Sequence, residues 1–157
     1  MQKKSSWLAT AGFSALSAAA AAIGGRITTR NMGWYRGLDK PAFQPPEWVF
    51  GPVWTGLYTL MSLSAARVYK AEPSPARTRA LTLWGIQLAA NAAWSPLFFG
   101  AHKPKLAMAD MAIMVASVIA YTNEARKVDK SAAWMMAPYL AWLGFAGLLN
   151  EEVIRRN

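Results

Sequence analysis

Residues 48–66 read WVFGPVWTGLYTLMSLSAA, a run that contains no Asp, Glu, Lys, Arg or His. Each such stretch is about 20 residues long, so as a helix rising about 1.5 Å per residue it would cross the roughly 30 Å hydrocarbon core of a bilayer. Four other stretches are also free of charge or nearly so: 5–25, 80–102 (only His102), 106–123 (only Asp110) and 131–150. The sequence therefore predicts an all-α integral membrane bundle of five transmembrane helices. Their expected bounds are about 5–26, 46–69, 79–101, 104–123 and 131–153, with a long loop at 27–45.

Composition supports a membrane environment for the whole chain, which we expect to form a single domain over 1–157. Hydrophobic residues make up 54% and charged residues 16%, whereas about one quarter of an average soluble domain is charged. A helical bundle in water is the alternative, but it would need polar outer faces that these stretches lack. The net charge of +9 could indicate nucleic acid binding. The basic residues stand at the ends of the apolar stretches, however, where they would anchor the protein at lipid headgroups.

Few residue types suited to catalysis or metal binding are available. The chain has no cysteine and one histidine, His102, which stands at an expected helix boundary, so we expect no metal site. No nucleophile lies beside a base, and no glycine loop could cradle a phosphate. Whether the protein is an enzyme stays open, because any chemistry would have to come from a bound ligand, light or oxygen.

The first apolar stretch has two interpretations. Lys3 and Lys4 followed by an alanine-rich run are also typical of a secretory signal peptide. The apolar run is longer than most signal peptides contain, which favours a retained helix. Its small residues Ala11, Ala15 and Ala19 recur at four-residue spacing and would let a neighbouring helix approach closely.

Three of the expected helices carry aromatic and polar residues at three- and four-residue steps, which place them along one face. Such faces could surround a flat apolar ligand, with indole and amide groups fixing its orientation. They could also represent interfacial anchoring or simple packing, and an amide such as Asn91 could bond another helix instead of a ligand. The residues are Trp54 and Tyr58, then Asn91, Trp94 and Phe98, and finally Tyr139, Trp142 and Ala146.

Two prolines and one carboxylate lie inside the expected helices. Pro96 and Pro138 each remove a backbone hydrogen bond, so we expect kinks that open a cavity or shape the bundle. Asp110 lies one turn into its helix. An intramembrane carboxylate is a candidate functional group, but its closeness to the interface favours a structural cap or an ion pair.

Three separated motifs resemble a known family. The first is WYRGLDKP at 34–41, followed by Pro45-Pro46 and WVFGPVW at 48–54. The second is NAAWSPLFFG at 91–100, and the third is PYLAWLGFA at 138–146, closing on Leu149-Asn150. Together they resemble the tryptophan-rich sensory protein and translocator protein family, also called TspO/MBR or peripheral-type benzodiazepine receptors, and the likeness extends over nearly the whole chain.

The resemblance implies a five-helix membrane fold, a homodimer, and a pocket under the first loop that binds a porphyrin such as protoporphyrin IX or haem, with no obligatory cofactor. It also implies a retained first helix. Trp54 and Trp142 are the tryptophans that the family associates with light-dependent oxidative breakdown of bound porphyrin. The ligand-binding candidates are Trp34, Tyr35, Trp54, Asn91, Trp94, Phe98, Tyr139, Trp142 and Ala146, of which Tyr139 follows from the helical spacing alone.

One departure from the family pattern concerns sterols. Animal members end the last helix with an aromatic-containing cholesterol pattern, whereas this chain has Glu151-Glu152 before Arg155. Cholesterol binding there is not expected, and a sterol-poor bacterial cell-envelope membrane would suit the sequence. The leading hypothesis is a membrane sensor or carrier of porphyrins. The alternatives are a porphyrin-degrading enzyme that uses light and oxygen, and a small efflux or structural membrane protein.

Overall fold

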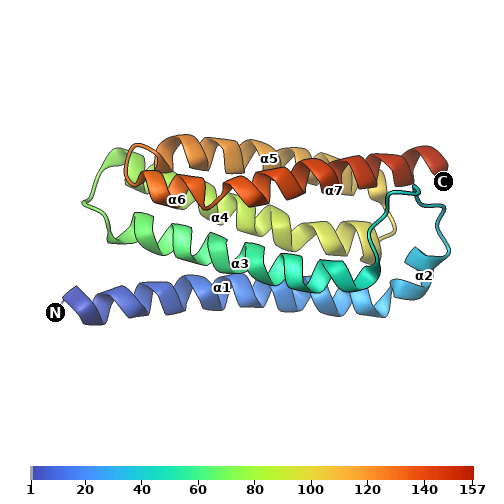
Figure 1. Ribbon diagram of the computed structural model, residues 1–157, viewed down its shortest axis with the longest axis horizontal. Coiled ribbons are helices and arrows are strands. Elements are labelled where there is room, and N and C mark those ends of the chain that lie inside the picture. Colours follow the sequence, from blue (N-terminus) through green and yellow to red (C-terminus); the bar gives the residue numbers. More distant parts are fainter. Residues whose placement is uncertain (1) are drawn as a thin grey trace.

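The computed structural model describes residues 2–157, with side chains from residue 6 onward, and the described residues contain helices and no strands (Figure 1). Lys3 and Lys4 therefore lie outside the described side chains. Five long helices run alongside one another, and three short segments connect or extend them. In chain order the elements are α1 (Gln2–Arg30), α2 (Met32–Arg36), α3 (Glu47–Lys70), α4 (Pro75–Ser95), the π-helix η1 (Pro96–Gly100), α5 (Pro104–Ala125), α6 (Lys130–Trp134) and α7 (Ala137–Arg156).

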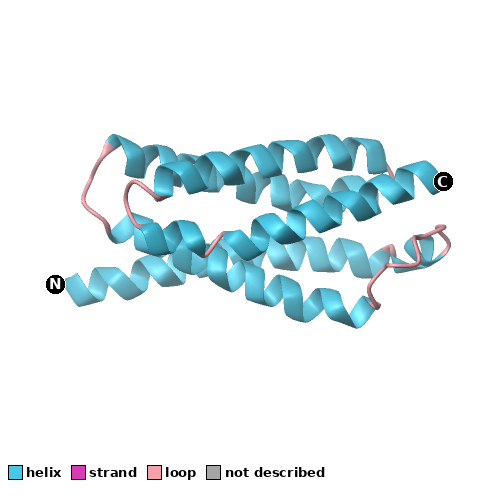
Figure 2. Cartoon of the chain, turned by 45° about the horizontal axis from the view of Figure 1, so that its top comes forward, coloured by secondary structure: helices cyan, strands magenta, loops and turns pink. Residues whose placement is uncertain are grey.

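Three of the helical stretches are long and apolar enough on their own to cross a membrane: Ser6–Arg30, Pro104–Ala125 and Lys130–Arg156. Helices α3 and α4 have 24 and 21 residues and lie in the same bundle (Figure 2). Their glycine, hydroxyl and amide residues lower the mean hydropathy, but several of these polar side chains, such as Ser62, Gln87 and Asn91, are buried. The protein is thus a helical membrane bundle, with three spans identified by composition and two by their place in the bundle.

The outer surface of the bundle is apolar. Large hydrophobic side chains are exposed along several helices, among them Leu16 on α1, Ile86 on α4, Ile113 on α5 and Leu148 on α7. In water such a surface would promote aggregation, whereas in a bilayer it contacts acyl chains. This distribution confirms the predicted membrane bundle.

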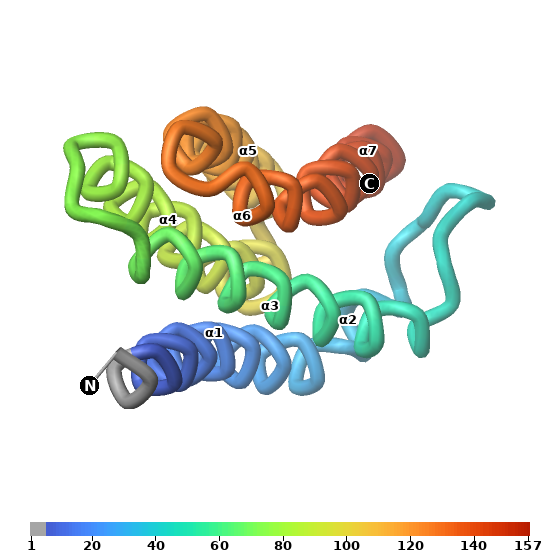
Figure 3. Tube along the Cα trace, turned by 60° about the vertical axis from the view of Figure 1, so that its left-hand side comes forward, coloured from blue at the N-terminus to red at the C-terminus, as the bar shows by residue number. Residues whose placement is uncertain are grey.

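Helix α1 packs against α3 and α4, and α5 packs against α4 and α7, an arrangement that Figure 3 shows nearly end-on. Two glycines allow close approach. A Cβ on Gly24 of α1 would lie 3.2 Å from the Ser95 Oγ of α4, and one on Gly147 of α7 would lie 3.3 Å from the Met111 sulfur of α5. Since α1 is packed into the bundle in this way, the structure favours the interpretation of the first apolar stretch as a bundle helix.

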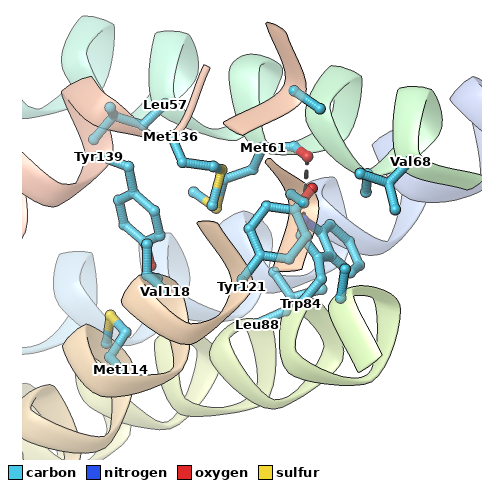
Figure 4. Packing of buried hydrophobic residues seen from close by; sticks show 14 of the residues in the cluster. Leu57, Met61, Val68, Trp84, Leu88, Met114, Val118, Tyr121, Met136 and Tyr139 are labelled. Carbon is cyan, nitrogen blue, oxygen red and sulfur yellow. Dashed lines mark hydrogen bonds between the residues drawn. The ribbon is translucent and has the colours of Figure 1, made fainter. Parts of the chain in front are cut away.

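The end of the bundle that carries α6, which we call the closed end, has a tightly packed core (Figure 4). Met61, Tyr121 and Met136 have no exposed surface there. The Trp84 indole N–H donates to the Met61 carbonyl at 3.1 Å. The Ser64 hydroxyl donates to the Ala132 carbonyl at 2.7 Å and lies 2.7 Å from the Tyr121 hydroxyl. Side chains from α3, α4, α5 and α6 therefore fill this end.

Pro96 has a different effect from the kink that we predicted. It ends α4 at Ser95 and begins the π-helix η1, in which the Ala101 N–H donates to the Pro96 carbonyl at 2.8 Å. Proline has no N–H to continue the α-helical bonding pattern, and the turn that follows it is a wider π-turn. Phe98 and Phe99, which follow the proline, are both buried.

A single helix over 131–153 was also predicted, and this is wrong in detail. The chain turns at Met135 and Met136, and Pro138 lies in the first turn of α7. Proline is favoured there because a first-turn N–H has no partner within the helix. Met136, at the break, is fully buried in the closed end.

The loops also differ from the expected bounds. The predicted loop 27–45 is shorter, because α1 continues to Arg30 and α2 occupies Met32–Arg36. Helix α4 begins at Pro75, four residues earlier than expected. The Ser74 hydroxyl accepts from the Arg77 N–H at 3.1 Å and caps it, as serine often does at a helix start.

Candidate functional site

The end of the bundle opposite the closed end, which we call the hollow end, contains a cavity of about 730 Å³. It is surrounded by α1, α2, α3, α4, η1, α5 and α7. Gln44 also lines it, from the segment 37–46 that links α2 to α3, hereafter the lid. Trp34 and Tyr139 are not among the residues that line it. Seven of the nine ligand-binding candidates do line it: Tyr35, Trp54, Asn91, Trp94, Phe98, Trp142 and Ala146.

One wall of the cavity consists of aromatic rings from α3 and α7. The Trp54 and Trp142 rings lie 6.4 Å apart at 85° to each other. Phe50 packs edge-on against Trp142 at 5.7 Å, and Phe145 lies 5.5 Å from the same indole. Edge-to-face packing of this kind is favourable between aromatic quadrupoles. These rings fill the space between α3 and α7.

A second aromatic wall comes from α4 and η1. The Trp94 and Phe98 rings stack at 4.7 Å with 15° between their planes. Trp34 packs edge-on against Phe98 at 5.7 Å but stacks on His102 at 4.1 Å. Trp34 therefore supports this wall from behind, at the surface, while Trp94 and Phe98 line the cavity.

Asn91 lies where the cavity meets the closed end. The Tyr58 hydroxyl donates to Asn91 Oδ1 at 2.5 Å, and Asn91 Nδ2 donates to the Tyr139 hydroxyl at 2.8 Å. We expected Asn91 either to bond another helix or to contact a ligand. Its amide does bond two other helices, α3 and α7, and Asn91 also lines the cavity. Tyr139 is completely buried, so its role here is to hold Asn91.

Four buried polar atoms of the cavity wall have no hydrogen-bond partner among the described residues. Two are donors, the indole N–H groups of Trp94 and Trp142, and two are acceptors, Gln44 Oε1 and Asn150 Oδ1. An unsatisfied buried polar group costs about 1–3 kcal/mol. These atoms have almost no accessible surface, so a molecule in the cavity would reach them only after the neighbouring side chains shifted.

Polar contacts hold the lid and the two helix ends that flank it. The Asp39 N–H donates to Asn157 Oδ1 at 3.0 Å, and Asn157 Nδ2 donates to the Asp39 carbonyl at 2.9 Å. Arg36 makes two hydrogen bonds, of 3.0 and 2.8 Å, to the Glu47 carboxylate. The Lys40 ammonium donates to the Tyr35 carbonyl at 2.8 Å. The contacts of Asp39 and Lys40 fasten the lid to the end of α7 and to α2, and the Arg36–Glu47 pair joins the two helices that flank the lid.

Tyr35 connects the lid to the cavity. Gln44 Nε2 donates to its hydroxyl at 2.6 Å, and its ring lies 5.3 Å from that of Phe99. Burial, with a smaller contribution from the nearby Glu47 carboxylate, raises the pKa of Tyr35 to about 12. The hydroxyl therefore stays neutral at physiological pH.

Few charged or metal-binding side chains line the cavity of the hollow end. No group of three or more His, Asp or Glu residues that could hold a metal ion occurs within residues 2–157. The ion pair or cap expected for Asp110 is also missing, because its buried Oδ2 has no hydrogen-bond partner among the described side chains. The cavity lining is mainly apolar, and Glu47 is the one carboxylate among its described lining residues.

Sequence reasoning missed several lining residues. Gln44 comes from the lid, and Met111 and Met114 come from α5. Helix α1 also contributes, through small and hydroxyl residues such as Ser17 and Gly24. The four-residue spacing of small residues on α1 was the available signal, but it indicated only close helix packing.

These features define a helical membrane protein with an aromatic internal cavity. The model of the TspO/MBR family matches residues 13–156. The chain is 37% identical to the translocator protein of Homo sapiens over 155 residues, which is 96% of this chain and 91% of that protein. It is 41% identical to the tryptophan-rich sensory protein of Cereibacter sphaeroides over 124 residues, 79% and 77% of the two chains. It is also 39% identical to the protein CrtK of Rhodobacter capsulatus, covering 79% and 78%. The chain belongs to the TspO/MBR family.

Proposed function

We propose that the protein binds a tetrapyrrole such as protoporphyrin IX or haem in the cavity of the hollow end, and acts as a membrane sensor or carrier of porphyrins. The observation that carries this proposal is the pair of aromatic walls that border the cavity, Trp54 with Trp142 and Trp94 with Phe98. The cavity, about 730 Å³ in volume, lies in the range of about 300–1,000 Å³ that small-molecule sites occupy. A flat macrocycle offers ring faces to the indoles and carries both donors and acceptors.

The family supports this proposal. One relative is named a translocator protein and another a tryptophan-rich sensory protein, names that fit carriage and sensing. The proposed ligand contacts are those of the lining candidates, with the rings of Trp94 and Trp142 facing the macrocycle. We assign Trp34 and Tyr139 supporting roles.

A titration in the dark tests the proposal. Protoporphyrin IX added to the purified protein should quench tryptophan fluorescence with saturation. Ala146→Phe places a ring in the cavity and should weaken binding at least about tenfold, which is about 1.4 kcal/mol. Ala141→Phe is the matched control, because Ala141 is exposed on the same helix and does not line the cavity. Equal affinity of the two variants for protoporphyrin IX would mean that the binding site is not this cavity.

The second candidate function is light-dependent oxidative degradation of the bound porphyrin. It is favoured by the pair of indoles, Trp54 and Trp142, at 6.4 Å on one wall. A photoexcited macrocycle could accept an electron from an indole, with dioxygen as the final oxidant. Illumination should then bleach the porphyrin into a defined product. Equal bleaching by the wild type and by Trp54→Phe/Trp142→Phe would leave binding as the function and exclude a catalytic role for the pair.

We also propose a homodimer in a sterol-poor bacterial membrane. Ala11, Ala15 and Ala19 are exposed on the outer face of α1, and small side chains let a second helix approach closely. Cross-linking in lipid nanodiscs should capture a dimer in the wild type. Ala15→Phe should reduce it, and an unchanged yield would place the contact on another face.

A further inference from the structure

The wall of the cavity differs between its two sides. Between α3 and α7 it is closed by large rings, chiefly Phe50, Trp54 and Trp142. Between α1 and α3 the lining residues are small, including Ala18 and Thr55, and both of these side chains are exposed. Because the lining side chains here are small, no large ring closes the cavity on this side, and we treat the space between α1 and α3 as its opening.

This opening lies at the depth of the hydrocarbon core. Leu16 and Ile23 on α1 and Leu63 on α3 are exposed at 54%, 49% and 38%, and they lie within the apolar parts of their helices. The ribbons of α1 and α3 cross and then separate toward the end that carries α2 (Figure 2). Where the helices cross, the Ser62 hydroxyl donates to the Ser17 hydroxyl at 2.9 Å and closes the opening.

Three of the hydroxyl groups along the opening are occupied within their own helices. The Thr55 hydroxyl donates to the Gly51 carbonyl at 2.9 Å, and the Thr59 hydroxyl donates to the Thr55 carbonyl at 2.8 Å. On α1 the Thr29 hydroxyl donates to the Gly25 carbonyl at 2.8 Å. Since these donors are satisfied locally, the opening costs little polar desolvation and suits an apolar molecule.

By contrast, the lid side is fastened. The paired hydrogen bonds between Asp39 and Asn157, and the two between Arg36 and Glu47, oppose movement of the chain on this side. From the difference between these two sides we infer that the ligand enters the cavity sideways from the bilayer, through the opening between α1 and α3. The inference rests on the proposed function, and its ligand is a flat apolar macrocycle already dissolved in the membrane.

Stopped-flow quenching in proteoliposomes tests this inference, with protoporphyrin IX supplied in the same bilayer. Ala18→Phe and Thr55→Phe narrow the opening from its two sides and should each slow uptake about tenfold, with release slowed as well. Ala116→Phe is the matched control, because Ala116 is exposed on α5 away from the cavity, and its uptake rate should match the wild type. If the Phe variants fail to fold, Ala18→Leu makes a smaller obstruction that should still slow uptake.

Asn157→Ala tests the other route, access through the lid, because it removes the side chain that holds Asp39. Uptake at the wild-type rate in this variant supports access from the bilayer. Faster uptake in Asn157→Ala, together with unchanged rates in Ala18→Phe and Thr55→Phe, would overturn the inference in favour of access through the lid. Absence of any saturable quenching in the wild type would instead reject the proposed function.

Discussion

The closed and hollow ends of the bundle use the same kinds of side chain for different purposes. At the closed end the Trp84 indole donates to the Met61 carbonyl, and the Tyr121 hydroxyl pairs with Ser64. At the hollow end the indole N–H groups of Trp94 and Trp142 have no partner among the described residues. Gln87 Oε1 is the exception at the closed end, since it too is unpartnered there.

The comparison teaches that aromatic content alone does not identify a binding site in a membrane bundle. Tryptophan and tyrosine occur at both ends, and the ends differ in how the rings pack. At the closed end Trp84 and Tyr121 are enclosed by other side chains and their polar atoms are bonded, whereas at the hollow end Trp54, Trp94 and Trp142 border a cavity.

The largest expected effect is on the stability of the closed end. Trp84 is 2% exposed, so Trp84→Ala should leave a void and lower the free energy of unfolding by about 3 kcal/mol. Trp142→Ala borders an existing cavity and should cost less than half of that. Unfolding in detergent, followed by circular dichroism, measures both. Equal losses would mean that the two ends are not packed differently.

The second prediction concerns ligand affinity at the hollow end. Trp142→Ala removes a ring of the cavity wall and should weaken protoporphyrin IX binding about tenfold, or about 1.4 kcal/mol. Trp134→Ala is the control, because Trp134 is 77% exposed and does not line the cavity. Its affinity should match the wild type, and a similar loss in both would show that quenching reports nonspecific partition.

A smaller effect is expected at the boundary between the two ends. Tyr58→Phe leaves Asn91 Oδ1 without the hydroxyl that donates to it, which should lower the free energy of unfolding by about 1 kcal/mol. Tyr69→Phe is the comparison, since the Tyr69 hydroxyl has no hydrogen-bond partner among the described residues. In thermal unfolding in one detergent, Tyr58→Phe should have a lower midpoint than Tyr69→Phe. Identical midpoints would mean that the hydrogen bond from Tyr58 to Asn91 does not stabilise the bundle.

The smallest expected effect is at the lid. The hydrogen bond from Arg36 holds the pKa of Glu47 below its usual value, so the pair contributes at neutral pH and is lost as the pH falls through that lowered pKa. Because both side chains are largely exposed, Glu47→Gln should lower the unfolding midpoint at pH 7 by at most about 2 °C. The difference from the wild type should vanish in acid. A difference that persists at low pH would exclude the ion pair as its cause.

Much of the fold could be predicted from the sequence, because a charge-free stretch of bilayer length has few stable alternatives to a membrane helix. The aromatic faces of 46–69 and 79–101 likewise follow from helical spacing. The π-turn after Pro96 and the break before Pro138 could not be predicted, because a proline permits a kink, a widened turn or a new helix start. Packing against neighbouring helices decides among these.

The candidate site was only partly accessible to sequence reasoning. Spacing places Trp142 and Tyr139 on one face of α7, but only the packing separates a cavity-lining ring from a fully buried one. Trp34 belongs to the first family motif, yet it stacks on His102 at 4.1 Å, behind the wall. That α1 lines the cavity could not be predicted, because small residues on a helix are as typical of close helix packing as of an opening.

The central claim, that the hollow end holds the ligand, is tested most directly by hydrogen–deuterium exchange of the protein with and without protoporphyrin IX in the dark. Ligand should slow exchange of the lid, 37–46, and of the first turns of α3, while exchange around Tyr121 and Met136 stays unchanged. Protection centred on the closed end, or saturable binding without any protection of the lid, would contradict this account.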